Sequence, residues 1–155
     1  MEKFENLVGE ILKWGTEIRS ETTSNLIVLE KQLVALYNFY YESQEMFEDK
    51  EYPDPPSFPA KEYMEIIQKN FPSIGYYGLV LDNQNLTGDN NNGVGDAIDD
   101  ISDILRDLWD INWYLKNTSA ANALFYFRLL FFTHTKGHII GLLGCMNGFN
   151  IQSGK

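Results

Sequence analysis

The residues with the clearest chemical potential are the two histidines of this 155-residue chain, His134 and His138. Four positions apart on one helix, two imidazoles lie on the same face, where both can reach one metal ion. A hydrolytic zincin would need a glutamate directly after the first histidine, where Thr135 stands, and a di-iron bundle would need glutamates at Phe131 and Thr135. His134 and His138 are therefore candidate metal ligands, although hydrogen bonding to backbone, Tyr or a neighbouring carboxylate is the preferred interpretation.

A row of aspartates between residues 96 and 110 follows the same helical period. Its members are Asp96, Asp100, Asp103, Asp107 and Asp110. At about 100° per residue this row lies opposite an apolar stripe that includes Ile98, Ile101, Leu105 and Leu108. We therefore expect these carboxylates to be solvated rather than to hold a metal or to catalyse. Arg106 is expected to pair with Asp103 or Asp110 along the helix.

The remaining nucleophilic and phosphate-binding patterns are weak. Cys145 follows His138 by two turns, about 10 Å along the helix axis, which is too far to share an ion. It is the only cysteine, so an intrachain disulfide is excluded, and we expect an inert core thiol. Gly93 and Gly95 precede no Lys-Ser/Thr pair of a phosphate loop. The sequence thus predicts no catalytic residue and no cofactor, and it does not favour an enzyme.

Hydrophobic spacing of three and four residues predicts the elements that must position these side chains. We expect helices over about 2–19, 26–46, 60–70, 96–117 and 119–147. They predict an all-α fold, an up-down bundle of four long helices plus one short helix, in a single domain at 1–150 with a disordered tail at 151–155. The last helix is apolar nearly all round, which predicts a central position with both histidines turned inward. Tyr76–Leu81 has strand-like composition but no evident partner, so we expect an irregular segment or a short helical turn.

Charge limits the classes of partner. The net charge of −10 disfavours nucleic acid and anionic membranes, because both are bound through Lys and Arg. An acidic surface suits a basic protein partner. The longest apolar stretch, Ala120–Phe132, is interrupted and too short to span a bilayer. With no leader-like start and one cysteine, the sequence predicts a cytoplasmic protein.

The segment from Asp99 to Leu108 resembles the signature of an uncharacterised bacterial group, the domain-of-unknown-function family 5063. Phe125, Phe127, Arg128, Phe131, His134 and His138 are similar in spacing to that family's late helix. Phe132 stands where the family has an acid, and Thr135 and Lys136 replace a Trp-Gly pair. The resemblance covers the C-terminal half of the chain. It implies an all-helical bacterial protein and brings no activity with it.

Two functional hypotheses follow. The first is a non-enzymatic helical module that binds another protein, because the chain has a good core, strong charge and no assembled catalytic constellation. The second is a metal-binding protein or metal-dependent enzyme that uses His134 and His138 with carboxylates or a Tyr from other helices. The oligomeric state does not follow from the sequence.

Overall fold

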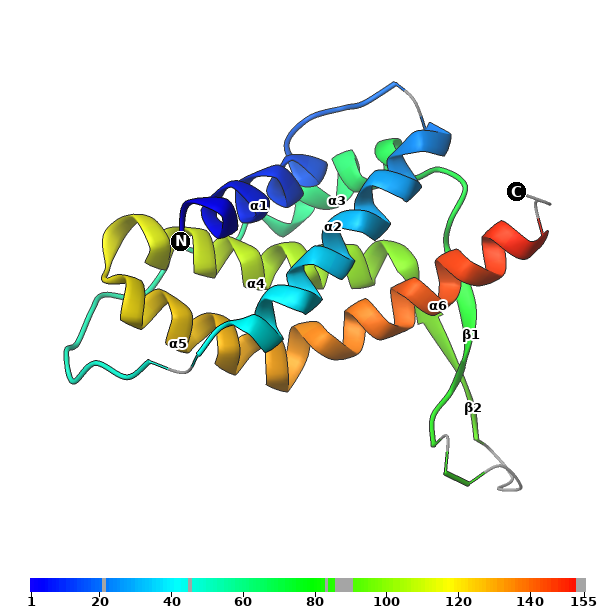
Figure 1. The fold of residues 1–155 in the computed structure, drawn as a ribbon. Helices are drawn as coiled ribbons and strands as arrows, with labels where there is room; N and C mark the ends of the chain where they lie inside the picture. The colour runs from blue at the N-terminus through cyan, green and yellow to red at the C-terminus, as the bar shows by residue number, and fades with distance from the viewer. Residues whose placement is uncertain (21, 45, 83, 86–90, 153–155) are drawn as a thin grey trace.

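The computed structural model describes residues 1–20, 22–44, 46–82, 84–85 and 91–152 (Figure 1). Its elements in chain order are α1 (Glu2–Leu12), a 3-10 turn (Lys13–Gly15), α2 (Thr22–Glu42), α3 (Ala60–Asn70), β1 (Tyr76–Val80), β2 (Asn92–Asp96), α4 (Ala97–Asn117), α5 (Ala120–Leu130), a π turn (Phe131–Thr135) and α6 (Lys136–Gln152). The predicted, mostly helical architecture is confirmed. The predicted tail falls mainly on residues 153–155, which lie outside the described residues.

Helix α4 occupies the centre of the molecule. It contacts α1, α3, α5 and α6, with α1 and α3 on one side of it in Figure 1 and α5 and α6 on the other. The helix begins where predicted, because the Asp96 side chain accepts a hydrogen bond from the Ile98 N–H at 3.0 Å and thereby caps its N-terminus. Asp99 and Asp100 in the first turn favour the positive end of the helix dipole. The central helix of the fold is therefore α4.

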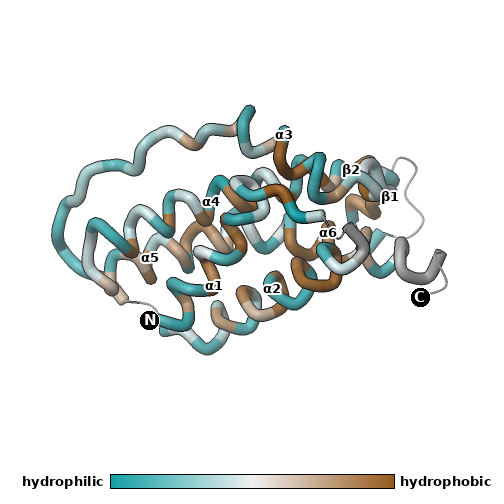
Figure 2. Tube along the Cα trace, turned by 90° about the horizontal axis from the view of Figure 1, so that it is seen from above, coloured by the Kyte–Doolittle hydropathy of each residue, from teal (hydrophilic) through white to brown (hydrophobic). Residues whose placement is uncertain are grey.

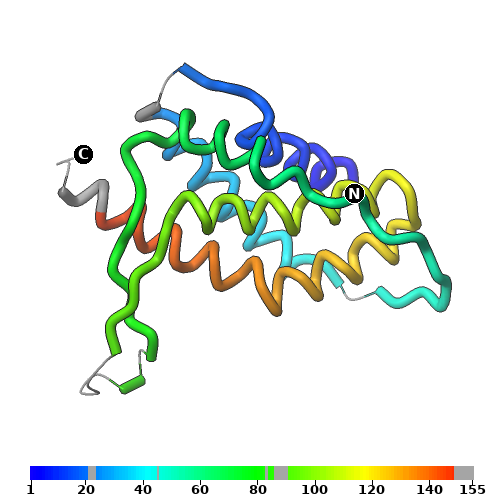
Figure 3. The backbone as a smooth tube through the Cα atoms, turned by 180° about the vertical axis from the view of Figure 1, so that it is seen from behind, coloured from blue at the N-terminus to red at the C-terminus, as the bar shows by residue number. Residues whose placement is uncertain are grey.

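The last helical stretch is less central than predicted. Leu129, Phe132 and Ile140 are 44%, 68% and 55% exposed, so the expectation of an interior helix is wrong. The stretch is also interrupted by the π turn, at which its axis changes direction between α5 and α6 (Figures 1 and 3). Wide turns of this kind bend helices and often occur at functional sites. His134 lies inside it.

The four-helix up-down arrangement is not confirmed. Helix α1 ends at Leu12, earlier than expected, and α2 crosses the molecule obliquely in front of α4 (Figure 1). Within the described residues, no helix combines the length and apolar character needed to cross a membrane.

The core is rich in aromatic side chains, as the composition predicts. Phe127 is 2% exposed and contacts the rings of Phe4, Phe39 and Phe131 at centroid distances of 4.7, 5.5 and 5.6 Å. These contacts join α1, α2 and the last helical stretch, and Figure 2 shows hydrophobic and hydrophilic residues alternating along the helices. Such rings bury large apolar areas, and they hold α5 and the π turn against α1 and α2.

A two-stranded antiparallel sheet replaces the irregular segment expected at Tyr76–Leu81. Tyr76 pairs with Asp96 and Val80 with Asn92, and the hairpin projects from one end of the helices (Figures 1 and 3). The prediction was wrong because it found no partner strand in the Asn- and Gly-rich stretch before α4. At Gly95 the strand requires a glycine, because a Cβ atom there would overlap the ring of Tyr77.

Candidate metal centre

The two histidine rings lie on the side of the last helical stretch that faces α4. His134 belongs to the π turn and His138 to the first turn of α6. His134 pairs with Asp107 and His138 with Asp100, so the order is reversed along α4, as antiparallel helices require. The side chains of His134 and His138 are 39% and 25% exposed. The imidazoles thus border the buried face, with protein on one side and access to solvent on the other.

The aspartate row is not solvated as predicted. Asp103 is only 9% exposed and Asp107 only 6%. Helices α4 and α6 are in contact, and α6 covers the face of α4 opposite its apolar stripe. The prediction failed because it assigned one buried face to a helix that is packed on several sides. Arg106 pairs with Asp103 at 2.5 Å, as expected.

Each histidine is held by a carboxylate at its Nδ1 atom. His134 Nδ1 lies 2.9 Å from Asp107 Oδ2, which also accepts the Thr135 hydroxyl at 2.6 Å. His138 Nδ1 lies 2.8 Å from Asp100 Oδ1. An ionised carboxylate only accepts, so each Nδ1 carries the proton and donates it. In a neutral imidazole this leaves a lone pair on Nε2.

The two Nε2 atoms meet. They are 3.2 Å apart, and Asp103 Oδ2 lies 3.5 Å from the Nε2 of His138. Asp103, His134 and His138 each offer one ligand atom, and these atoms all lie within 4.8 Å of one another. The cluster therefore presents two imidazole nitrogens and one carboxylate oxygen to a common point. This donor set suits Zn²⁺ and non-haem Fe²⁺.

The carboxylates also alter the protonation of the cluster. The hydrogen bond to Asp100 raises the pKa of His138 above its ordinary value, with help from the charges of Asp103 and Asp107 and against the effect of burial. Burial, followed by the hydrogen bond to Asp100, raises the pKa of Tyr77. Tyr77 is therefore a neutral hydroxyl that donates to Asp100.

Tyr77 is the residue of this site that the sequence analysis missed. Its hydroxyl donates to Asp100 Oδ2 at 2.6 Å, while Oδ1 of the same carboxylate holds His138. Two glycines make room for it, since a Cβ at Gly95 or at Gly141 would overlap the Tyr77 side chain. The glycines were visible in the sequence, but their link to Tyr77 depends on the pairing of β1 with β2.

Cys145 takes no part in the three-residue cluster of Asp103, His134 and His138. It is half-buried, and burial raises the pKa of its thiol. A raised pKa favours the protonated, less reactive thiol.

Comparison of the chain with family profiles, curated proteins and solved structures finds no match. The resemblance to family 5063 therefore stays a prediction.

Proposed function

We propose that this protein binds one divalent transition-metal ion through Asp103, His134 and His138. This reverses the order of the two hypotheses drawn from the sequence. The carboxylate that the sequence left unplaced is supplied by α4, whose Asp103 lies 3.5 Å from the Nε2 of His138. Two imidazoles and one carboxylate form the donor set of many catalytic zinc and non-haem iron sites.

The observation that carries the proposal is the 3.2 Å separation of the two Nε2 atoms. With both Nδ1 protons donated to carboxylates, two neutral imidazoles would direct lone pairs at each other. That arrangement is repulsive unless a cation lies against both nitrogens. Ligand nitrogens of a tetrahedral zinc ion, about 2.0–2.1 Å from the metal, are about 3.3 Å apart. The spacing in the cluster agrees with that value.

The surroundings also resemble those of metal sites. Ligating histidines commonly donate their other ring nitrogen to a carboxylate, which fixes the ring and raises its basicity. Asp107 and Asp100 have this relation to His134 and His138, respectively. Three aspartates, Asp100, Asp103 and Asp107, supply negative charge, of which Arg106 offsets one unit. A divalent ion would neutralise the remainder.

Among the described residues the cluster offers three ligands, for a metal that takes four or more. Open positions distinguish catalytic from structural zinc sites. His134 is the most exposed member, with 39% of its side chain accessible, so solvent or a small substrate can reach the ion. This favours a metal-dependent enzyme over a purely structural metal, and the metal would act there as a Lewis acid.

The alternative cation is a proton. One imidazolium could donate its Nε2–H to the other ring, and the pair would then be a structural hydrogen bond. The raised pKa of His138 is compatible with this alternative as well. Metal analysis separates the two.

The test is elemental analysis of protein purified without an affinity tag, followed by titration of the chelator-treated protein with Zn²⁺ and Fe²⁺. We expect one equivalent of metal, lost in the His134→Ala, His138→Ala double variant. An Asp110→Asn variant, which changes a half-buried carboxylate on the same helix, serves as the control and should keep its metal. Trace metal only, with no saturable binding of either ion, would refute the proposal.

A protein-binding module remains the second proposal. A specific observation supports it: the outer face of the hairpin is apolar and solvent-exposed, with Tyr76 81% and Val94 75% accessible. Exposed apolar patches commonly mark interaction surfaces. Affinity capture from the native host should recover a basic partner that a Tyr76→Ser, Val94→Ser double variant fails to bind. Equal recovery by both proteins, or none, would contradict this role for the hairpin.

A further inference from the structure

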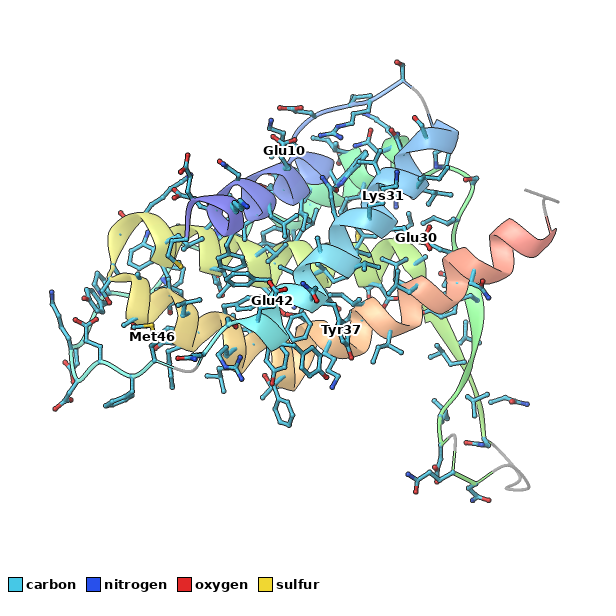
Figure 4. All side chains as sticks on the ribbon, viewed as in Figure 1. Glu10, Glu30, Lys31, Tyr37, Glu42 and Met46 are labelled. Carbon is cyan, nitrogen blue, oxygen red and sulfur yellow. The ribbon has the colours of Figure 1, made fainter. Side chains whose placement is uncertain are left out.

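A second candidate site lies at the other end of α4. Tyr114 follows Asp103 by 11 positions, which is roughly 16 Å along the helix axis. Beside it is a partly open pocket of about 370 Å³, lined by the segment 47–52 and by residues of α4 and α5. In Figure 4, Met46 lies where this segment leaves α2 and approaches α5. The volume is within the range of small-molecule pockets.

Aromatic rings form much of the wall. They belong to Phe47, Tyr52, Tyr114, Phe125 and Tyr126. Tyr114 and Tyr126 are stacked, with centroids 4.2 Å apart and planes 8° from parallel. Phe125 stands at 86° to Tyr126, and Phe47 at 75° to Phe125. The rings of the wall are thus set at different angles, one pair parallel and two pairs nearly perpendicular.

The charged residues of the wall are mostly acids. Glu48, Asp49 and Glu51 line the cavity together with one base, Lys50. The Glu48 carboxylate is fixed, because its Oε2 accepts hydrogen bonds from Tyr52 at 3.1 Å and from Ser119. Its other oxygen remains to add negative potential. A neutral or anionic ligand gains nothing from this charge, whereas a cation does.

The protein itself places a cation on one of these rings. The ammonium of Lys50 lies 4.7 Å from the centroid of Tyr52, which is a cation–π contact. At least one ring of the wall therefore turns its electron-rich face to a positive charge.

We propose that this cavity binds an alkylated ammonium group. Several aromatic rings set at different angles, with carboxylates beside them, are the kind of lining that recognises quaternary ammonium ions. The rings accept the methyl groups, which cannot donate hydrogen bonds, and the acids supply the opposite charge. Either a free quaternary amine or a trimethylated lysine side chain carries this chemistry. The inference is independent of the metal site.

The experiment is calorimetric titration of the full chain, at low salt and without amine buffers, with choline and separately with free trimethyllysine. The control ligand is 3,3-dimethylbutanol, which has the shape of choline but a carbon in place of the charged nitrogen. We expect saturable binding of at least one ammonium ligand, weakened by added salt, and at least tenfold weaker binding of the neutral control. Preference for choline indicates a free amine, and preference for trimethyllysine indicates a modified protein.

Variants locate the site. Phe47 is 76% exposed, so Phe47→Ala should fold normally and weaken binding about fivefold through loss of one ring face. Lys50→Gln should strengthen binding, because it removes the competing cation. Tyr41→Ala, which removes an exposed ring outside this cavity, should leave the affinity for the ammonium ligands unchanged. Absence of binding, equal binding of the neutral control, or equal affinities of Phe47→Ala and the unmodified chain would overturn the proposal.

Discussion

Replacing Asp107 by Asn tests the metal proposal without touching a ligand. Asp107 Oδ2 accepts from His134 Nδ1 at 2.9 Å and from Thr135 Oγ1 at 2.6 Å. An amide has nearly the same shape, and its oxygen still accepts, but the negative charge is lost. The Nδ1–H···O bond is then weaker, and the imidazole becomes a poorer donor at Nε2.

The size of the effect follows from these contacts. Loss of a carboxylate behind a ligating histidine typically lowers metal affinity 10- to 100-fold, or about 1.4–2.7 kcal/mol. In the metal-free variant, two charge-assisted hydrogen bonds become neutral ones. We expect this change to lower its free energy of unfolding by about 1–2 kcal/mol. The variant should therefore fold, bind metal and bind it more weakly.

The assay is competitive Zn²⁺ titration against a chromophoric chelator, with urea unfolding in chelator as the measure of stability. Asp99→Asn is the matched control: Asp99 is exposed on the same helix, and its carboxylate lies close enough to interact with His138 and Asp103. It should lose the same charge and change the affinity less than threefold, since it removes no carboxylate hydrogen bond to a ligand. If Asp107→Asn and Asp99→Asn weakened binding equally, the proposed role of the Nδ1 bond would be refuted.

Three further predictions concern the surroundings of the site and the fold. Gly141→Ala should lower the unfolding free energy by about 1–2 kcal/mol, because its Cβ would displace the Tyr77 hydroxyl from Asp100. Gly144 has open space around it, so Gly144→Ala should instead stabilise the helix by about 0.5–1 kcal/mol. Equal urea midpoints for the two variants would contradict this. In metal-free protein, kept so by a chelator, His138 has a higher pKa in the folded chain than in the unfolded chain. Its protonation therefore stabilises the fold at pH values below the unfolded pKa of about 6.5. This contribution is lost as the pH rises through the higher pKa of the folded chain. As the pH rises above about 6.5, the unfolding free energy should therefore fall more in the unmodified chain than in His138→Gln. Parallel curves would exclude the effect. Asn70→Ala should lower the free energy of unfolding, measured in urea, by about 2–4 kcal/mol. The fully buried side chain donates to the carbonyls of Trp14 and Glu17 and accepts from the Arg19 N–H. A loss below about 1 kcal/mol would show that these groups find other partners.

The helices were predictable because residues close together in the sequence determine where a helix ends and which of its faces is apolar. Helix α3 has the bounds expected, Ala60–Asn70, and α4 has the expected cap at Asp96. The hairpin was not predictable in this way, because β1 is recognisable only once β2 is paired with it. Its partner contains Gly93 and Gly95, residues that favour loops when they are considered alone.

The site was half predictable for a related reason. Spacing within one helix placed His134 and His138 together, and the contact of their rings confirms it. Spacing within α4 likewise placed Asp100, Asp103 and Asp107 on one face. Periodicity does not show whether a polar face of one helix contacts another helix or solvent, because that depends on how the helices pack. The carboxylates were therefore assigned to solvent, although they pack against α6.

The π turn has a consequence for how this chain tolerates change in length. A turn of this kind contains one residue more than an α-helical turn of the same rise. Deletion of Thr133, whose side chain is exposed, would restore ordinary winding and leave the later residues in nearly their present orientation relative to α5. His138 would still face Asp100, whereas deletion of a residue from the regular part of α5 would rotate it away by about 100°. The π turn is therefore a point at which this helix can lose a residue and still direct its histidines at α4.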